Sequence, residues 1–474
     1  IRKFKKESNL SPRASPSDRI TLTQHTTWAL GVTRRTYLLS GEGKSEVLEG
    51  SQLDGVLEDQ EEGGGGTESP RGAVRAFLPW LSKSIKMSKY ERRLDAILVH
   101  LLPKDFRQFP ENYFAYARWY MMASVAGSAS MVLSTQSMLY AIGLGAGAIP
   151  MAAALNWVIK DGLGQLGGVL FASCVNSRFD ADPKRWRMVA AVSLDAACFL
   201  EALTPLAPIF FLPMASIANM GKNVSWLAAS ATRANIHLSF ARRANLADIT
   251  AKAGSQTVLA STIGTTLGVF ISPLVGTHPT TILPAIAAIS SFHLFCTFQA
   301  LSKVKCDTLN AQRAEIATIE FLNRFNSNSP RPTGDDKVGW VPSPSWVSER
   351  EIVIGKPIGS NLMYGYSSSL PRKVVIGVSL DSIAKDSLLD VWGSLRDSGV
   401  HVSSTNQTVN VLIAQNATAP QILEGFLEAM GASMGVHVPK LAKDAYLDGL
   451  KAAGWNTKVL FLETYSARVS VSTT

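Results

Sequence analysis

The sequence is poor in the residue types from which metal sites and many catalytic centres are built. Its 474 residues include only four cysteines and seven histidines. No CxxC pair occurs, and no two histidines lie at metal-ligand spacing. Three of the cysteines lie inside apolar runs, which favours buried, reduced thiols over a disulfide framework. A nucleophile elbow, a P-loop and a dinucleotide-binding fingerprint are also absent from the sequence. We therefore predict no catalytic residue, no metal site and no enzymatic activity.

Charged residues are scarce as well, and the shortage is local. They make up 18% of the chain, against roughly 25% in an ordinary soluble domain. Residues 119–159 and 253–302 contain no Asp, Glu, Lys or Arg. Each stretch is longer than the roughly 20 residues that a helix needs to cross a bilayer. Glycine and proline interrupt the first near residues 143–150 and the second near residues 276–279, so each predicts a hairpin of two apolar helices.

Small residues recur at helical spacing in the apolar part of the chain. Glycines lie four residues apart in three places, which are Gly143 with Gly147, Gly164 with Gly168, and Gly264 with Gly268. Such pairs allow two helix backbones to approach closely. These segments contain much Ala, Gly, Ser and Thr, so a soluble bundle with a fully buried core is the alternative to a membrane protein. We expect a mainly α-helical bundle, with membrane embedding the favoured environment.

A further apolar segment, residues 188–220, leaves the number of membrane spans open. It contains Asp195 and Glu201 and is flanked by basic residues at 178–187 and at 233–252. One crossing would place these basic regions on opposite sides of a membrane, which conflicts with the positive-inside rule. Either the segment does not cross once, or the number of spans differs from the apparent one.

The remaining sequence divides the chain into further regions. Residues 1–88 are expected to be disordered, and their basic, Ser- and Thr-rich beginning suits either a plastid transit peptide or a plain basic tail. The helical core is expected at 89–325, a linker at 326–348 and a small α/β or α+β domain at 349–474. In that domain we predict strands at 373–378, 408–414 and 458–462, and helices at 381–396, 419–431 and 440–453.

Polar residues inside the apolar region are the candidates for a binding site. Lys160 and Asp161 interrupt an apolar run, where charges are costly unless they are paired or face a cavity. A helix end at the membrane surface, with Lys160 reaching out to water, is the alternative. The candidate polar site comprises Asn156, Lys160, Asp161, Asp195, Glu201, Asn219 and Asn223. A candidate basic face, for an acidic partner or anionic lipid, comprises Arg233, Arg242, Arg243 and Lys252.

The net charge of +9 is compatible with an anionic partner. The sequence contains no helix-turn-helix, zinc-finger or basic-zipper signature. We expect a membrane as partner and no nucleic acid.

Several sequence blocks resemble the Root UVB Sensitive family. They are NWVIKDGLG at 156–164, DPKRWR at 182–187, TRA at 232–234, and NLADITAK at 245–252 followed by GSQ at 254–256. The resemblance extends over roughly residues 102–468. It implies links to UV-B tolerance, vitamin B6 homeostasis and early development, a plastid or membrane location, and action together with other family members or further copies. No catalytic residue is established for this family, so none is transferred.

Three hypotheses follow. The first is a non-enzymatic membrane scaffold, adaptor or small-molecule carrier. The second is a sensor or enzyme that binds pyridoxal phosphate, with Lys160, Lys222 or Lys252 as the amine and Gly254-Ser255 as a phosphate site. The third is a soluble adaptor that uses the candidate basic face.

Overall fold

The computed structural model forms two units, Ile1–Ser69 and Pro70–Thr474. It describes residues 20–28, 31–39, 45–48, 101–103, 111–143, 150–175, 179–241, 245–326, 340–355, 370–378, 388–462 and 468–469.

The N-terminal unit contains an antiparallel sheet in the order β1-β2-β3. Its strands are β1 (Ile20–Trp28), β2 (Gly31–Leu39) and β3 (Ser45–Leu48). The prediction of disorder was wrong for these strands, which are rich in Thr, Val and Leu. Such residues favour extended backbone, although the segment as a whole is polar. The rest of that predicted region, through residue 88, lies outside the described residues.

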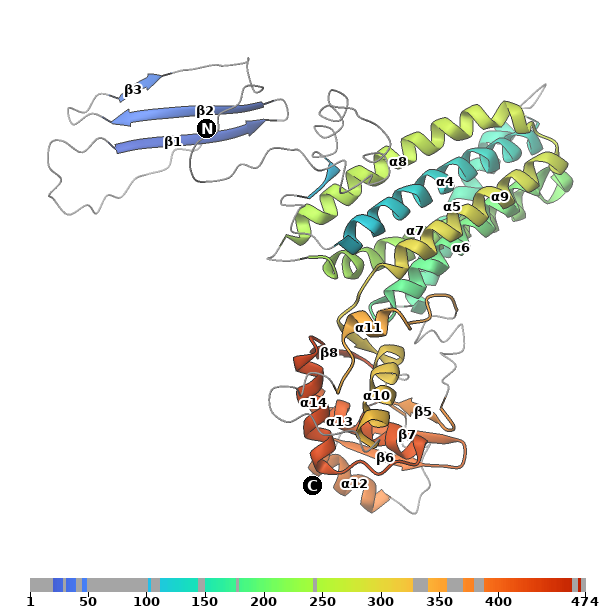
Figure 1. Ribbon diagram of the computed structural model, residues 1–474. Coiled ribbons are helices and arrows are strands. Elements are labelled where there is room, and N and C mark those ends of the chain that lie inside the picture. The colour runs from blue at the N-terminus through green and yellow to red at the C-terminus, as the bar shows by residue number, and fades with distance from the viewer. Residues whose placement is uncertain are drawn as a thin grey trace, which may run out of the picture. The chain divides into compact units, whose positions relative to one another are not determined.

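The second unit begins with a bundle of long helices (Figure 1). They are α4 (Glu111–Ala141), α5 (Pro150–Val175), α6 (Pro183–Ala202), α7 (Phe211–Leu238), α8 (Leu246–Val275) and α9 (Pro279–Ser302). Local signals set several of these ends. The side chain of Asp182 caps α6 and that of His278 caps α9, each followed by proline in the first turn. Gly276 ends α8 with a positive φ of 71°.

The bundle has two layers. In one layer α4 lies between α8 and α9, and in the other α7 lies between α5 and α6. Helix α6 also packs on α4 and α9. The breaks predicted within both apolar stretches are confirmed, but α4 and α5 belong to different layers. They do not form the paired hairpin that the sequence indicated.

Two of the three glycine pairs serve the predicted close packing. Gly264 and Gly268 face α4, and Gly164 and Gly168 face Asn219 and Asn223 of α7. For the first pair the prediction was wrong. Gly143 lies in the turn after α4 with φ 75°, where no neighbouring atom comes within 4 Å of an added Cβ. Its partner Gly147 lies outside the described residues.

The segment 188–220 runs toward one end of the bundle and turns back. It contains most of α6, the short turns η3 (Thr204–Leu206) and η4 (Pro208–Phe210), and the start of α7. Lys184, Arg185 and Arg187 at the start of α6 and Arg233 near the end of α7 therefore lie toward one end of the bundle, and not on opposite sides of it. Arg178, Arg242 and Arg243 lie outside the described residues. The described connections at the other end, 203–210 and 276–278, contain no Asp, Glu, Lys or Arg.

Large apolar side chains cover much of the outer surface of α5 and α8. Leu166 and Val169 are exposed on α5, and Val258, Phe270 and Leu274 are exposed on α8. By length and composition, three helical segments of the described chain could cross a membrane. These are Pro183–Leu206, Leu246–Val275 and Pro279–Ser302.

The C-terminal part is a small α/β domain. Its elements are β4 (Thr308–Asn310), α10 (Ala311–Asn326), α11 (Pro344–Ser348), β5 (Lys373–Ile376), α12 (Leu388–Ser398), β6 (Val400–Ser404), β7 (Thr408–Ile413), α13 (Ala419–Met434), α14 (Lys440–Ala452) and β8 (Asn456–Phe461). One sheet has the order β5-β7-β6, with β5 parallel and β6 antiparallel to β7. A second sheet pairs β4 with β8 in parallel. The predicted strands are confirmed as β5, β7 and β8, whereas β4 and β6 were missed. The predicted helices correspond to α12, α13 and α14, and residues 381–387 of the first predicted helix lie outside the described residues.

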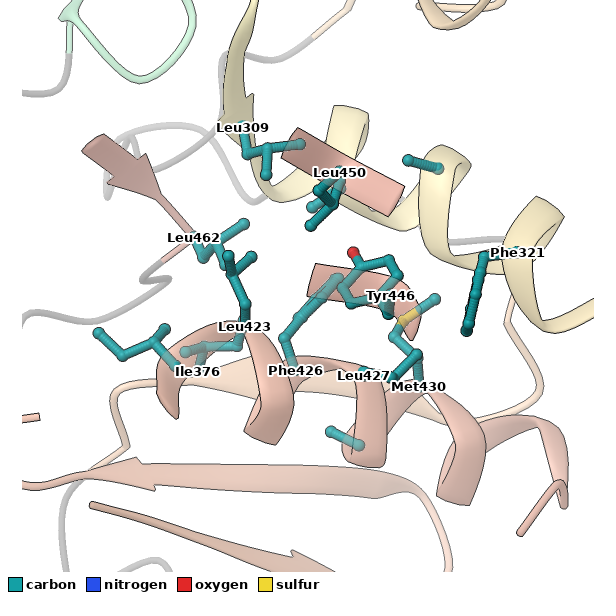
Figure 2. Packing of buried hydrophobic residues seen from close by; sticks show 14 of the residues in the cluster. Leu309, Phe321, Ile376, Leu423, Phe426, Leu427, Met430, Tyr446, Leu450 and Leu462 are labelled. Carbon is teal, nitrogen blue, oxygen red and sulfur yellow. The ribbon is translucent and has the colours of Figure 1, made fainter. Parts of the chain in front are cut away.

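The core of this domain lies between α10, α13 and α14 (Figure 2). Phe321 of α10 packs near Tyr446 of α14, with ring centroids 5.1 Å apart. Helix α10 thus packs within this domain. The sequence-based boundary had placed residues up to 325 in the helical core. The expected linker also ends earlier than residue 348, because Val347 is buried and the indole of Trp455 donates a 2.8 Å hydrogen bond to the carbonyl of Pro342.

Candidate functional site

The first turn of α6 attaches the bundle to the C-terminal part of the chain. The Lys184 ammonium lies 2.6 Å from the Glu351 carboxylate, and both side chains are buried. Arg185 donates to the side chain of Gln312 at 2.9 Å and to the carbonyl of Ile352 at 2.8 Å. The DPKRWR block therefore carries residues that fix α6 to α10 and to the segment that follows α11.

Glu351 is the centre of this junction. Arg313 of α10 donates to its second oxygen at 3.1 Å, so two buried cations share one buried carboxylate. Burial by itself would raise the pKa of Glu351, but Lys184 and Arg313 outweigh it and hold the pKa below its usual value. A paired charge of this kind is expensive to break, because the remaining partner stays buried without compensation.

The next two residues of the block point into the bundle. Trp186 packs against Phe179 and Phe171. Arg187, only 6% exposed, donates to the carbonyl of Ala229 and to the hydroxyl of Tyr120. Its guanidinium lies 4.8 Å from the centre of the Tyr120 ring.

Arg187 lines a cavity of about 310 Å³ formed by α4, α6, α7, α8 and α9. Arg233 and His293 contribute the other ionisable nitrogen groups. Hydroxyl groups are abundant around it, from Ser124, Ser128, Ser225, Ser230, Thr257, Ser261 and Thr297. Alanines and Gly127 leave the space, because their side chains are too small to fill it. The described residues that line the cavity include no Asp, Glu or Lys.

A second hollow of about 610 Å³ adjoins the first. The two share Ser128, Met131, Trp226 and Ser261, and the second extends along α4 and α8 to Leu139. The inner cavity is thus continuous with a groove in the bundle surface.

His293 is a site residue that the sequence did not reveal. Its Nδ1 lies 2.8 Å from Oδ2 of Asp195, and its Nε2 is 3.5 Å from a Cβ added to Gly127. Oδ1 of Asp195 is buried and finds no hydrogen-bond partner among the described residues. The partner of His293 is 98 residues away in sequence, so no local spacing could have indicated the pair.

The candidate polar residues do not converge on one site. Lys160 pairs with Asp161 at 2.6 Å, and the Asn219 amide donates to the same carboxylate at 3.2 Å. Glu201 pairs with Lys222 at 2.5 Å. Asp195 forms its separate pair with His293. Lys160, Asp161, Asn219 and Asn223 thus meet where α5 packs on α7, whereas Asp195 and Glu201 lie in two separate pairs.

Two further details of that prediction are settled. Lys160 is 4% exposed and lies over the Trp157 ring, so it does not extend to a membrane surface. Asn223 donates to the Asn219 carbonyl at 2.9 Å, and Asn156 is half-buried.

The candidate basic face is only partly described. Arg233 is exposed and borders the cavity, and Lys252 is half-buried in α8. Arg242 and Arg243 lie outside the described residues. Gly254 and Ser255, suggested as a phosphate site at a helix start, lie inside α8, where the backbone amides already serve the helix. That detail was wrong.

Comparison with known proteins defines the class. Residues 87–324 match the vitamin B6 photo-protection and homoeostasis domain, which here comprises the bundle and most of α10. Within that class, the chain belongs to the root UVB sensitive family.

Three relatives from Arabidopsis thaliana show the extent of the similarity. Protein root UVB sensitive 3 is 26% identical over 79% of this chain and 86% of its own length. Protein root UVB sensitive 4 is 35% identical over 52% of this chain and 46% of its own length. Protein root UVB sensitive 2, chloroplastic, is 34% identical over 49% and 50% respectively. No solved structure matches the chain.

Proposed function

We propose that this protein is a membrane-embedded, non-enzymatic carrier that holds a small solute in the bundle cavity. The observation that carries the proposal is the polarity of the bundle. Large apolar side chains face outward on α5 and α8, while Lys160, Asp195 and Glu201 are buried and paired. A water-soluble bundle has the opposite arrangement.

The outer hydroxyl groups also suit a lipid environment. Thr262 and Thr266 of α8 donate to the carbonyls four residues earlier, at 2.9 and 2.8 Å. A hydroxyl satisfied by its own helix can face hydrocarbon without an unpaired donor. The 30 residues of α8 extend about 45 Å, which exceeds the roughly 30 Å of a bilayer core.

The charge distribution supports one orientation. Among the described residues, Lys184, Arg185, Arg187 and Arg233 gather toward one end of the bundle, whereas the connections 203–210 and 276–278 at the other end carry no formal charge. By the positive-inside rule, the basic end stays in the compartment from which the protein inserts.

The cavity favours a carrier over a scaffold, because a scaffold needs no internal space. The matched domain's name supports a role in vitamin B6 homeostasis and UV-B tolerance. A plastid location is proposed from the name of the chloroplastic relative. The exposed apolar faces of α5 and α8 are available for further copies or other family members within the membrane.

A pyridoxal phosphate site remains the second candidate, because the family name refers to vitamin B6. The residues present do not fit its covalent form. Lys160 and Lys222 are paired with carboxylates, and the described cavity lining supplies no lysine for a Schiff base. Only non-covalent binding is compatible with this lining.

Carbonate extraction tests membrane embedding. Wild-type protein should stay in the membrane pellet at alkaline pH, and detergent should release it. A matched variant replaces Val158, Leu166 and Val169 by Gln, and we expect less of it in the pellet because these side chains would face lipid. Release of the wild type into the carbonate supernatant would favour the soluble adaptor and contradict the proposal.

A further inference from the structure

We propose that the bundle cavity binds an oxyanion, the phosphate or carboxylate group of a small molecule whose remainder is an apolar ring. Arg187 and Arg233 supply the opposite charge. This inference rests on the proposed carrier function for the role of the cavity, and it names the class of solute.

The first support is the environment of Arg187. Its hydrogen-bond partners are both neutral, the Ala229 carbonyl and the Tyr120 hydroxyl. Among the described residues, no carboxylate forms an ion pair with it. An isolated buried guanidinium is costly, and proteins normally compensate it with an anion. Elsewhere in this chain the rule holds, because Lys184 and Arg313 share Glu351. The cavity beside Arg187 is where the missing anion can lie.

The second support is the character of the other lining groups. Arg233 borders the same cavity and has no ion-pair partner within the described part of the chain. Hydroxyl groups from α4, α7, α8 and α9 surround the space. Those of Ser124 and Thr257 donate to carbonyls of their own helices. The hydroxyls of Ser128, Ser225, Ser230, Ser261 and Thr297 can donate to an oxyanion. The carboxylate of Asp195 is paired with His293, which lines the cavity. The lining therefore favours negative charge and disfavours cations.

The third support concerns the rest of the ligand. Tyr120, Met131, Leu194 and Trp226 give the cavity an apolar surface as well. Its volume of about 310 Å³ lies at the lower end of the range for small-molecule pockets. A molecule with one charged group and one ring fits both the size and the divided polarity.

Calorimetric titration of the full chain in detergent tests the inference. The probes are phenyl phosphate, benzoate and uncharged phenol, in a chloride-free buffer. We expect saturable binding of phenyl phosphate, benzoate or both, and none of phenol. Binding of only one of the two anions identifies the phosphate or the carboxylate as the preferred group.

Substitutions locate the binding. Arg233→Gln should weaken binding about tenfold or more, because a charge-assisted hydrogen bond is lost. Arg187→Gln should weaken anion binding further. Because Arg187 is buried, this change can also impair folding, so the exposed Arg233 is the decisive position for the test. Arg350→Gln is the matched control, since Arg350 is an exposed arginine over the Trp346 ring, outside the cavity. The affinity of the Arg350→Gln variant for the anions should not change.

Three results would overturn the inference. They are absence of saturable binding by either anion, full affinity in Arg233→Gln, and equal weakening by Arg350→Gln. None of these depends on carbonate extraction. A protein released by carbonate can still bind the anion, and an embedded protein can fail to bind it.

Discussion

The bundle and the C-terminal domain place their large apolar side chains on opposite sides. In the domain, Phe321, Leu423, Phe426 and Tyr446 are buried against one another, as Figure 2 shows. In the bundle, many helix contacts are made by alanine and glycine, while leucine, valine and phenylalanine project outward. The difference is the one expected if the bundle lies in a membrane, as proposed above. Water drives large side chains inward in the domain, whereas a lipid environment removes that driving force and leaves close backbone contact to hold helices together.

The strongest test of close packing in the bundle is Gly264→Ala. An added Cβ would lie 2.2 Å from the Val125 carbonyl oxygen, so α8 cannot keep its place on α4. We expect a severe loss of folded protein, measured as the monodisperse yield in detergent. Gly254→Ala in the same helix is the control, because nothing lies within 4 Å of its added Cβ. It should be neutral or stabilising by up to about 1 kcal/mol. Equal tolerance of both changes would contradict the described packing.

The junction between the two regions should be almost as sensitive. Glu351→Leu leaves Lys184 and Arg313 buried without their shared carboxylate. The expected cost is about 3–5 kcal/mol, read as a lower unfolding temperature in detergent. Glu428→Leu, which removes an exposed partner of Lys443, should change stability by less than about 1 kcal/mol. A small effect of Glu351→Leu would show that the junction does not hold the two regions together.

Truncating apolar side chains compares the two kinds of surface directly. Phe426→Ala removes a buried ring and should cost about 3–5 kcal/mol. Leu166, 62% exposed on α5, should tolerate alanine within about 0.5 kcal/mol. Thermal unfolding of both variants in the same detergent measures the difference. A large loss from Leu166→Ala would mean that another protein element covers this face.

Acid should weaken the junction between the bundle and the C-terminal domain. Of the effects expected here, this one is the smallest near neutral pH. Because the folded pKa of Glu351 is lowered, its stabilisation is complete above the ordinary carboxyl value of about 4.3. It is lost as the pH falls below that value and through the lower folded pKa. Unfolding temperatures of the wild type and of Glu351→Gln, followed from pH 7 to pH 3, should converge at the acidic end. Parallel curves would show that Glu351 does not contribute this dependence.

Much of the architecture could be predicted from local patterns. The uncharged runs predicted apolar helices, and segments rich in Val and Ile predicted β5 and β7. The short strand β4 was missed because its three residues carry no periodicity and need β8, far away in sequence, as a partner. The N-terminal strands were missed because composition outweighed the local β-forming pattern.

The candidate site was predicted less well. Lys160 and Asp161 were correctly singled out as charges that need partners, but the cavity lies elsewhere. Arg187 was visible only as part of a family-like block, without any sign of its chemical role. Its significance depends on which neighbours it lacks, and a linear pattern cannot show that.

The sequence by itself determined which segments avoid water, where they break, and where charges interrupt them, because helix formation and hydrophobicity act over a few neighbouring residues. Only the tertiary structure decided which charges meet. Asp195 reaches His293, and Lys184 reaches Glu351, through contacts between distant segments. Arg187 keeps no carboxylate among the described residues, because the rotation of α6 turns it toward small and hydroxyl-bearing side chains. Helix rotation and layer order result from packing of the whole bundle, and they placed a cavity lined by Arg187 and Arg233 between its helices.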